Sequence, residues 1–193
     1  MSGQKPVKVD AGGIAASAKA AAGKGPPPVH LWDPPFCGDL DMQIRTDGTW
    51  FYEGTPIGRA PLVRLFASIL KREGEKYFLV TPVEKVGIEV EDVPFVAVDV
   101  EVHGTADAQV LRFETNVGDV VEAGQEHALR VVFDPNTSEP RPYLHVRRGL
   151  EARVDRKSFY RLVDLGVTQG DHFGLWSKGV FFPVIPTAEL HQE

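Results

Sequence analysis

The sequence predicts an α+β protein with two similar β-β-α-β-β units of mostly antiparallel sheet, linked by an all-β middle block. Three observations support this fold class. A hairpin pattern surrounds Asp47-Gly48, an amphipathic helical pattern follows Pro61, and the same order of patterns returns after Pro140. Because a helical crossover does not follow every strand, antiparallel pairing is favoured over a doubly wound parallel sheet.

The first unit opens with a hairpin. Residues 40–44 alternate apolar and polar side chains, Asp47-Gly48 supplies the turn, and residues 50–52 form the return strand. A helix is expected to follow and to end near Gly74, because apolar residues then recur at helical spacing: Leu62, Leu65, Phe66, Ile69 and Leu70. Two further strands are predicted at residues 77–81 and 86–90.

The middle block and the second unit complete the pattern. The block has three strand candidates, at residues 95–102, 108–115 and 128–133. The second unit has strands at 143–146 and 150–154, a helix at 158–165, and a hairpin formed by 173–176 and 180–185. Arg64-Leu65-Phe66 then parallels Arg161-Leu162-Val163, and residues 78–82 parallel residues 182–186. The alternative to a duplication is that a hairpin followed by a helix recurs by chance.

These patterns predict a tail at residues 1–28, a first α+β domain at residues 29–94 and a second at residues 95–193. The tail is rich in Ala, Gly, Lys and Pro and offers little apolar surface for a core. Residues 14–22 within it can form a short helix if something holds them, and a partner subunit is one candidate.

Net charge and hydropathy restrict the location and the partners. With 21 Lys and Arg against 27 Asp and Glu, the net charge of −6 disfavours general binding to nucleic acid or to anionic membranes. The longest apolar stretches, residues 94–98 and 179–185, are far shorter than the roughly 20 residues that cross a bilayer. We therefore expect a cytoplasmic protein without a membrane or nucleic-acid partner.

Positive charge is concentrated late in the chain. Residues 141–161 hold seven cations and two anions, which gives this segment a net charge of +5. Arginine suits phosphate or carboxylate recognition because its planar guanidinium donates two parallel hydrogen bonds. Arg153 lies opposite the apolar face of its strand, and Arg156 lies at the start of the second helix, where backbone amides attract anions. The alternative is that these arginines pair with the protein's own carboxylates.

Two other groups of residues have the chemistry for a site. Trp50 and Tyr52 in the first hairpin, with Arg59 before the helix, can form a stacking platform, although such aromatic residues more often belong to the edge of a core. Asp99, Glu101 and His103 share one face of a strand and can ligate a divalent cation, although a solvated outer face is the more usual reading.

Eight short motifs between residues 30 and 185 carry a family resemblance, at residues 47–50, 54–59, 62–66, 79–82, 90–95, 115–119, 149–153 and 176–177. Together they resemble the motifs of DUF1285, a bacterial family of unknown function. The resemblance implies an α+β protein in two parts with repeated motifs and a role in signalling or ligand sensing, and it supplies no catalytic residues.

The sequence therefore favours a non-enzymatic binding or regulatory module for a small anionic molecule or a protein partner, contacted by Trp50, Tyr52, Arg59, Arg153 and Arg156. No catalytic signature, cofactor motif or resident metal is predicted, because the common phosphate, dinucleotide, hydrolase and zinc motifs do not occur. Two alternatives stay open. One is a metal-assisted hydrolase that uses Asp99, Glu101 and His103, and the other is a structural protein that forms a homodimer.

Overall fold

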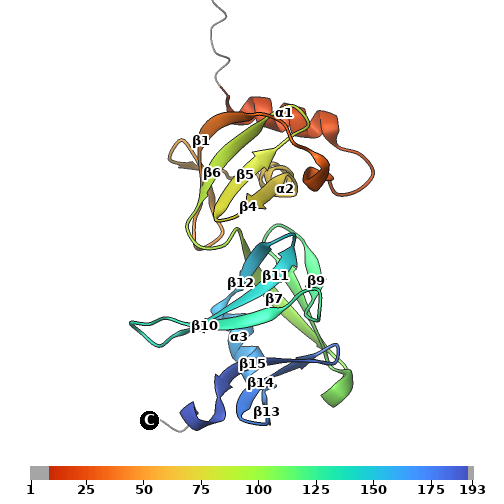
Figure 1. The fold of residues 1–193 in the computed structure, drawn as a ribbon, viewed down its shortest axis with the longest axis vertical. Coiled ribbons are helices and arrows are strands. Elements are labelled where there is room, and N and C mark those ends of the chain that lie inside the picture. The colour runs from red at the N-terminus through yellow and green to blue at the C-terminus, as the bar shows by residue number, and fades with distance from the viewer. Residues whose placement is uncertain (1–8, 191–193) are drawn as a thin grey trace, which may run out of the picture. The chain divides into compact units, whose positions relative to one another are not determined.

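In the computed structural model, which describes residues 9–190, the chain divides into two compact units, Met1–Asp92 and Val93–Glu193 (Figure 1). The predicted domain boundary after Pro94 lies close to this division. The first eight residues of the predicted tail lie outside the described residues. We call the two parts unit 1 and unit 2 and describe each by itself.

Unit 1 contains one six-stranded sheet with the order β3-β2-β1-β6-β5-β4. Strand β1 pairs antiparallel with β2 and parallel with β6, and its buried residues Leu40, Met42 and Ile44 alternate with polar residues. The predicted turn joins β1 to β2, with the backbone N–H of Thr49 donating to Asp47 Oδ1 at 2.9 Å. The elements of unit 1 are α1 (Ala11–Ala21), η1 (Val29–Leu31), β1 (Phe36–Ile44), β2 (Trp50–Tyr52), β3 (Thr55–Pro56), α2 (Ala60–Ser68), β4 (Leu70–Glu73), β5 (Lys76–Val80) and β6 (Lys85–Val90).

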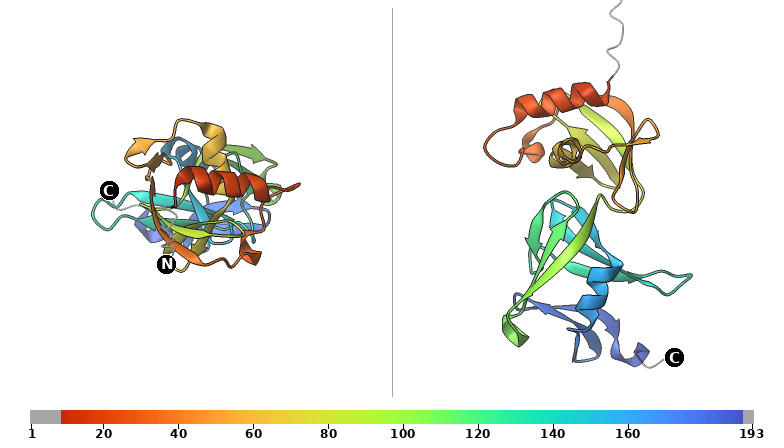
Figure 2. Two further views of the ribbon diagram at one scale, coloured as in Figure 1. Left: turned by 90° about the horizontal axis from the view of Figure 1, so that it is seen from above. Right: turned by 180° about the vertical axis from the view of Figure 1, so that it is seen from behind.

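Helix α1 shows that the predicted tail is in part a component of the core. Asp10 caps the helix by accepting from the backbone N–H of Gly13 at 2.7 Å, and Ile14 is 0% exposed. The helix lies beside α2 of the same unit (Figure 2), so no partner subunit is needed to hold it. The alanines that suggested a tail, such as Ala15 and Ala18, instead allow close packing of the helix.

Unit 2 contains a six-stranded sheet with the order β10-β11-β12-β7-β8-β9 and a three-stranded sheet, β13-β14-β15. Ser177 of β14 joins the second sheet to the first: its hydroxyl accepts from the backbone N–H of Leu111 and donates to the carbonyl of Ala123. The elements of unit 2 are β7 (Phe95–His103), η2 (Ala106–Ala108), β8 (Val110–Thr115), β9 (Val120–Glu122), β10 (Leu129–Phe133), β11 (Pro140–Arg147), β12 (Leu150–Val154), α3 (Arg156–Val163), β13 (Val167–Gln169), β14 (His172–Ser177), β15 (Val180–Pro186) and η3 (Thr187–Glu189).

The two six-stranded sheets have the same topology. In each sheet, three consecutive strands form one antiparallel meander and the next three form another. The first and last strands then pair in parallel at the centre, β1 with β6 and β7 with β12. The chain is therefore α+β with two similar six-stranded units and mostly antiparallel pairing.

This topology corrects the predicted repeat. The residues expected to form a linking all-β block belong to the second six-stranded sheet: the first two strands are β7 and β8 of its first meander, and the third is β10 of its second meander. Strands β7 to β12 therefore correspond to β1 to β6. The β-β-α-β-β order expected after Pro140 does not describe one sheet, because β11 and β12 belong to the large sheet whereas β14 and β15 belong to the small one. Parallel closure joins segments about fifty residues apart, and hairpin and helix patterns do not report such pairing.

Candidate functional site

Strand β12 places Arg153 on the face of the sheet that is opposite the core. Ala152 and Val154 are buried, so the alternate residues Glu151 and Arg153 point the other way. The strand register continues the row on both sides of Arg153: Tyr143 of β11 lies opposite it, Arg130 of β10 lies opposite Tyr143, and Val96 of β7 borders Arg153 on its other side. We call Arg130, Tyr143 and Arg153 the arginine row.

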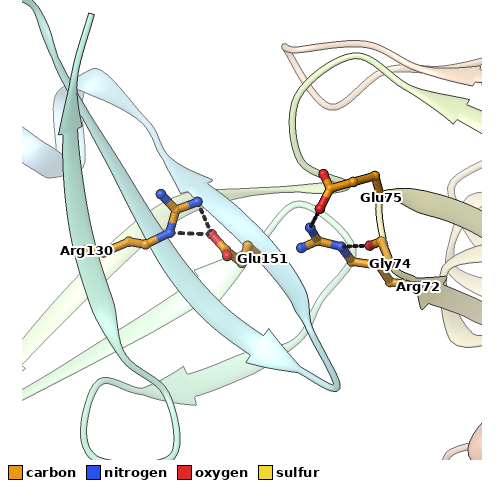
Figure 3. A network of polar contacts seen from close by, with 5 residues as sticks. All are labelled: Arg72, Gly74, Glu75, Arg130 and Glu151. Carbon is orange, nitrogen blue, oxygen red and sulfur yellow. Dashed lines mark hydrogen bonds and ion pairs between the residues drawn. The ribbon is translucent and has the colours of Figure 1, made fainter.

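Arg130 is fully engaged within the arginine row. Its guanidinium carbon lies 4.4 Å from the centre of the Tyr143 ring. Its Nε and Nη2 donate to Glu151 Oε2 at 3.1 and 2.7 Å, as Figure 3 shows. The Glu151 side chain is 18% exposed, so this pair is shielded from water on the carboxylate side. The same figure also draws residues of unit 1, where Arg72 donates to the carbonyl of Gly74 and contacts Glu75.

Four of the seven cations predicted to attract an anion pair with the protein's own carboxylates. Arg161 lies 2.8 Å from Asp99, and Arg156 lies 3.6 Å from Glu139. The other two pairs are Arg141 with Asp134 and Arg147 with Asp119. These four ion pairs therefore neutralise much of the positive charge of residues 141–161.

Arg153 differs from these paired arginines. Within residues 9–190, it makes no side-chain hydrogen bond and no ion pair, and Arg148 and Lys157 likewise make no ion pair. Arg153 is partly buried, whereas Arg148 and Lys157 are exposed. A guanidinium that is partly removed from water without a partner loses hydration that nothing in the protein replaces. This combination makes Arg153 the best candidate anion contact in unit 2.

The N-terminus of α3 does not provide the free amides that the sequence suggested. Asp155 accepts from the backbone N–H of Ser158 at 2.8 Å, so a carboxylate of the chain already caps this helix. Arg156 is the first residue of the helix, and its side chain is 72% exposed. Arg156 can therefore contribute a mobile positive charge close in sequence to Arg153, whereas the helix end cannot contribute amides.

The three site residues predicted in and after the first hairpin, Trp50, Tyr52 and Arg59, belong to unit 1 and do not form a stacking platform there. Trp50 is 1% exposed and stacks on Phe66 with ring centres 6.3 Å apart. Tyr52 is partly buried, and its hydroxyl accepts from the backbone N–H of Ala11 at 3.4 Å. Arg59 is exposed at the N-cap position of α2. The core-edge reading therefore describes Trp50 better than a ligand contact does.

Asp99, Glu101 and His103 point away from the core, as predicted, but each has a polar partner within the chain. Asp99 forms an ion pair with Arg161, and Glu101 Oε2 lies 3.2 Å from His103 Nε2. The backbone N–H of Val100, followed by the guanidinium of Arg161, holds the pKa of Asp99 below its usual value. Among the described residues, no three His, Cys, Asp or Glu side chains are placed to hold a metal ion. These three side chains are therefore not brought together as one set of metal ligands.

A β-bulge corrects one detail of that strand. The register of β7 against β8 shifts between Ala97 and Asp99. Strict alternation would place Val98 on the apolar face with Val100, but the extra residue turns Val98 outward, where it is 36% exposed.

The sequence reasoning missed Arg130 and Tyr143. Both residues occupy the polar face of alternating strands, which is a signal that the sequence contains. What the sequence does not contain is the register that places the two residues in one row with Arg153.

In residues 9–190, no helix has both the length and the apolar content needed to cross a membrane.

Comparisons with known proteins identify the family. Residues 27–93 match the N-terminal domain and residues 94–184 the C-terminal domain of DUF1285, a family of unknown function. A crystal structure of a DUF1285 family protein from Silicibacter pomeroyi is 60% identical, covers 96% of this chain and 100% of that chain, and has a TM-score of 0.88. One from Shewanella baltica is 32% identical, covers 65% and 91%, and has a TM-score of 0.51. No curated protein matches the chain. The chain belongs to the DUF1285 family.

Proposed function

We propose that the protein is a non-enzymatic, regulatory binding module whose unit 2 recognises a small anionic molecule at Arg153. The observation that carries this proposal is that Arg153 lacks, in the part of the chain that the structure describes, the ion pair that most other arginines of unit 2 have. Arg130, Arg141, Arg147, Arg156 and Arg161 each have a carboxylate partner, whereas the partly buried Arg153 has none within the described residues.

The neighbours of Arg153 favour an anion for two reasons. Glu151 is already engaged by two nitrogens of Arg130, which lowers its ability to neutralise Arg153. The pair of Arg156 with Glu139 is long, at 3.6 Å, and its side chains are 72% and 61% exposed, so little free energy is lost when Arg156 leaves it for a ligand. A phosphate or carboxylate group can then accept two parallel hydrogen bonds from Arg153 and a further one from Arg156.

The proposal places the protein in the cytoplasm and gives it a signalling role. The thiol of Cys37 is free and exposed, and a reducing compartment would keep it so. Binding of an anion would order the side chains of Arg153 and Arg156 without a bond-making step. A change of that kind is suited to sensing a ligand.

Differential scanning fluorimetry tests this function with pyrophosphate, citrate, ATP and a cyclic dinucleotide at physiological ionic strength. We expect at least one probe to raise the melting temperature, and we expect Arg153→Gln to abolish the shift. Arg148→Gln is the matched control, because Arg148 also makes no ion pair within residues 9–190 but lies in the exposed turn after β11.

The proposal fails if no probe shifts the melting temperature, or if Arg153→Gln retains the same shift as the native chain. Light scattering coupled to size exclusion, with and without the active probe, separates a small-molecule site from one that binds a second copy of the chain. A dimer that Arg153→Gln dissociates in the absence of any probe would contradict the small-molecule proposal and support the homodimer alternative.

A further inference from the structure

Unit 1 has a groove of about 440 Å³ on the face of its sheet. Its lining comes mainly from β1, β5 and β6, with Glu75 and Glu91 at the ends of these strands. The volume falls within the usual range of about 300–1,000 Å³ for small-molecule sites. The groove is a feature of unit 1 alone and is distinct from the arginine row of unit 2.

The absence of a side chain at Gly87 opens this groove. Gly87 of β6 lies opposite Asp39 of β1 and opposite Phe78 of β5. A Cβ atom at this position would lie 2.2 Å from Asp39 Oδ1 and 3.8 Å from Phe36 Cε2. The Phe36 and Phe78 rings meet edge to face with centres 6.0 Å apart. The groove therefore has an apolar wall beside a bare stretch of backbone.

The backbone under the groove offers few hydrogen bonds to a ligand. Strand β6 lies between β1 and β5, so the ladders on both sides use its N–H and C=O groups. A peptide cannot add to this part of the sheet as a further strand, because only edge strands have free backbone groups. The occupant must therefore be recognised by side chains.

The side chains around the groove are predominantly acidic. Four carboxylates, those of Asp39, Glu75, Glu89 and Glu91, face one cation, Lys76. Glu75 contacts Arg72, and Glu91 accepts from the backbone and the hydroxyl of Thr46. Asp39 and Glu89 have no side-chain partner within residues 9–190. They stand on adjacent strands, with Asp39 opposite Gly87 and Glu89 two residues further along β6.

The carboxylates of the groove are spread out. No three acidic or histidine side chains among the described residues are placed to share a metal ion. Spaced carboxylates along an apolar wall complement a cation whose charges are separated by methylene groups. The Phe78 ring is 9% exposed and has the Lys85 ammonium, which is paired with Glu73, 4.9 Å from its centre. The methylene groups would therefore lie along the bare backbone at Gly87, while an ammonium group at each end donates to a carboxylate.

We propose that the groove of unit 1 binds a linear organic polyamine, with ammonium groups held by Asp39 and Glu89. Calorimetric titration of the full chain with spermidine at physiological ionic strength tests this site. We expect saturable binding, weakened about two- to fivefold by Asp39→Asn or Glu89→Gln and about tenfold or more by both together. The control is Glu53→Gln, which removes an exposed carboxylate of unit 1 outside the groove and should leave the affinity unchanged.

Three further titrations make the test specific. Mg²⁺ and a short monoamine should bind at least about tenfold more weakly than spermidine, because neither can reach two separated carboxylates. Gly87→Ala should weaken spermidine binding, because the new methyl group displaces the Asp39 side chain. Each variant is accepted only if its thermal unfolding matches that of the native chain. Absence of spermidine binding, equal affinity for Mg²⁺, or equal effects of Glu53→Gln and Glu89→Gln would overturn the proposal.

Discussion

The ring of Tyr143 separates a paired arginine from an unpaired one. Tyr143 lies opposite Arg153 across the β11–β12 ladder, and the Arg130 guanidinium lies over the same ring. Arg130 also holds Glu151, so the carboxylate nearest to Arg153 on its own strand is already engaged. This arrangement leaves Arg153 as the surplus positive charge of the row, and the proposed function depends on it.

Ile14→Ala should destabilise unit 1. The side chain is 0% exposed on α1, and its removal leaves a cavity between the helix and the sheet, which costs about 2–5 kcal/mol. Urea unfolding of the full chain, followed by tryptophan fluorescence, measures the change; Trp32 and Trp50 report on unit 1, and Trp176→Phe removes the signal of unit 2. Lys19→Ala, on the exposed side of the same helix, is the control and should change the free energy of unfolding by less than about 0.5 kcal/mol. Equal stability of the two variants would mean that α1 does not contribute to the core.

Ser177→Ala should destabilise unit 2 by about 1–3 kcal/mol. The hydroxyl is 0% exposed, accepts from the N–H of Leu111 at 2.9 Å and donates to the carbonyl of Ala123 at 2.7 Å. Its loss leaves two buried backbone groups without partners. Amide hydrogen exchange at Leu111 measures the lost protection of this N–H group and should be faster in Ser177→Ala than in the native chain. Unchanged exchange at Leu111 would argue against the bond, and Ser138→Ala in the exposed β10–β11 turn serves as the control.

The stability of unit 2 should decrease in acid, in part through Asp134. The backbone N–H groups of Asn136 and Thr137, with Arg141 nearby, hold the pKa of Asp134 below its usual value of 3.8. Because the folded pKa is the lower one, this contribution is fully present above the unfolded pKa and is lost as the pH falls through the folded pKa. Asp134→Asn keeps an acceptor for the turn and removes the titrating carboxyl group. Unfolding midpoints measured between neutral pH and about pH 2 should therefore decline less steeply for this variant than for the native chain.

The matched control for that titration is Asp107→Asn, which removes an exposed carboxylate from η2. Its acid profile should follow that of the native chain. If Asp134→Asn also follows the native profile, the turn around Asp134 does not stabilise the charged carboxylate.

Local sequence patterns predicted the individual elements well where short-range chemistry decides them. Asp47-Gly48 forms the turn between β1 and β2, and the helical spacing that includes Leu62 and Phe66 identifies α2. The helical spacing also included Leu70, and this prediction was wrong. Leu70 begins β4, where it pairs with Leu79. A buried leucine satisfies both patterns, and only its partner strand distinguishes them.

The parallel pairs and the ion pairs could not be predicted from local patterns. The closure of β1 on β6 and of β7 on β12 depends on segments that meet only in the folded chain. The charge reversal in residues 141–161 correctly identified the cations, but their partners lie elsewhere. Arg161 pairs with Asp99 and Arg147 with Asp119, which lie 62 and 28 residues earlier in the chain. Arg153 was predicted as one arginine of several, and its lack of a partner is visible only after the others are paired.

An NMR titration of the side-chain Nε–Hε resonances of the arginines, with pyrophosphate added at physiological ionic strength, tests most directly whether Arg153 binds an anion. We expect a saturable shift of the Arg153 resonance, a smaller one at Arg156 and none at Arg148. An Arg153 resonance that does not move, or that moves only in step with Arg148, would contradict anion binding at Arg153.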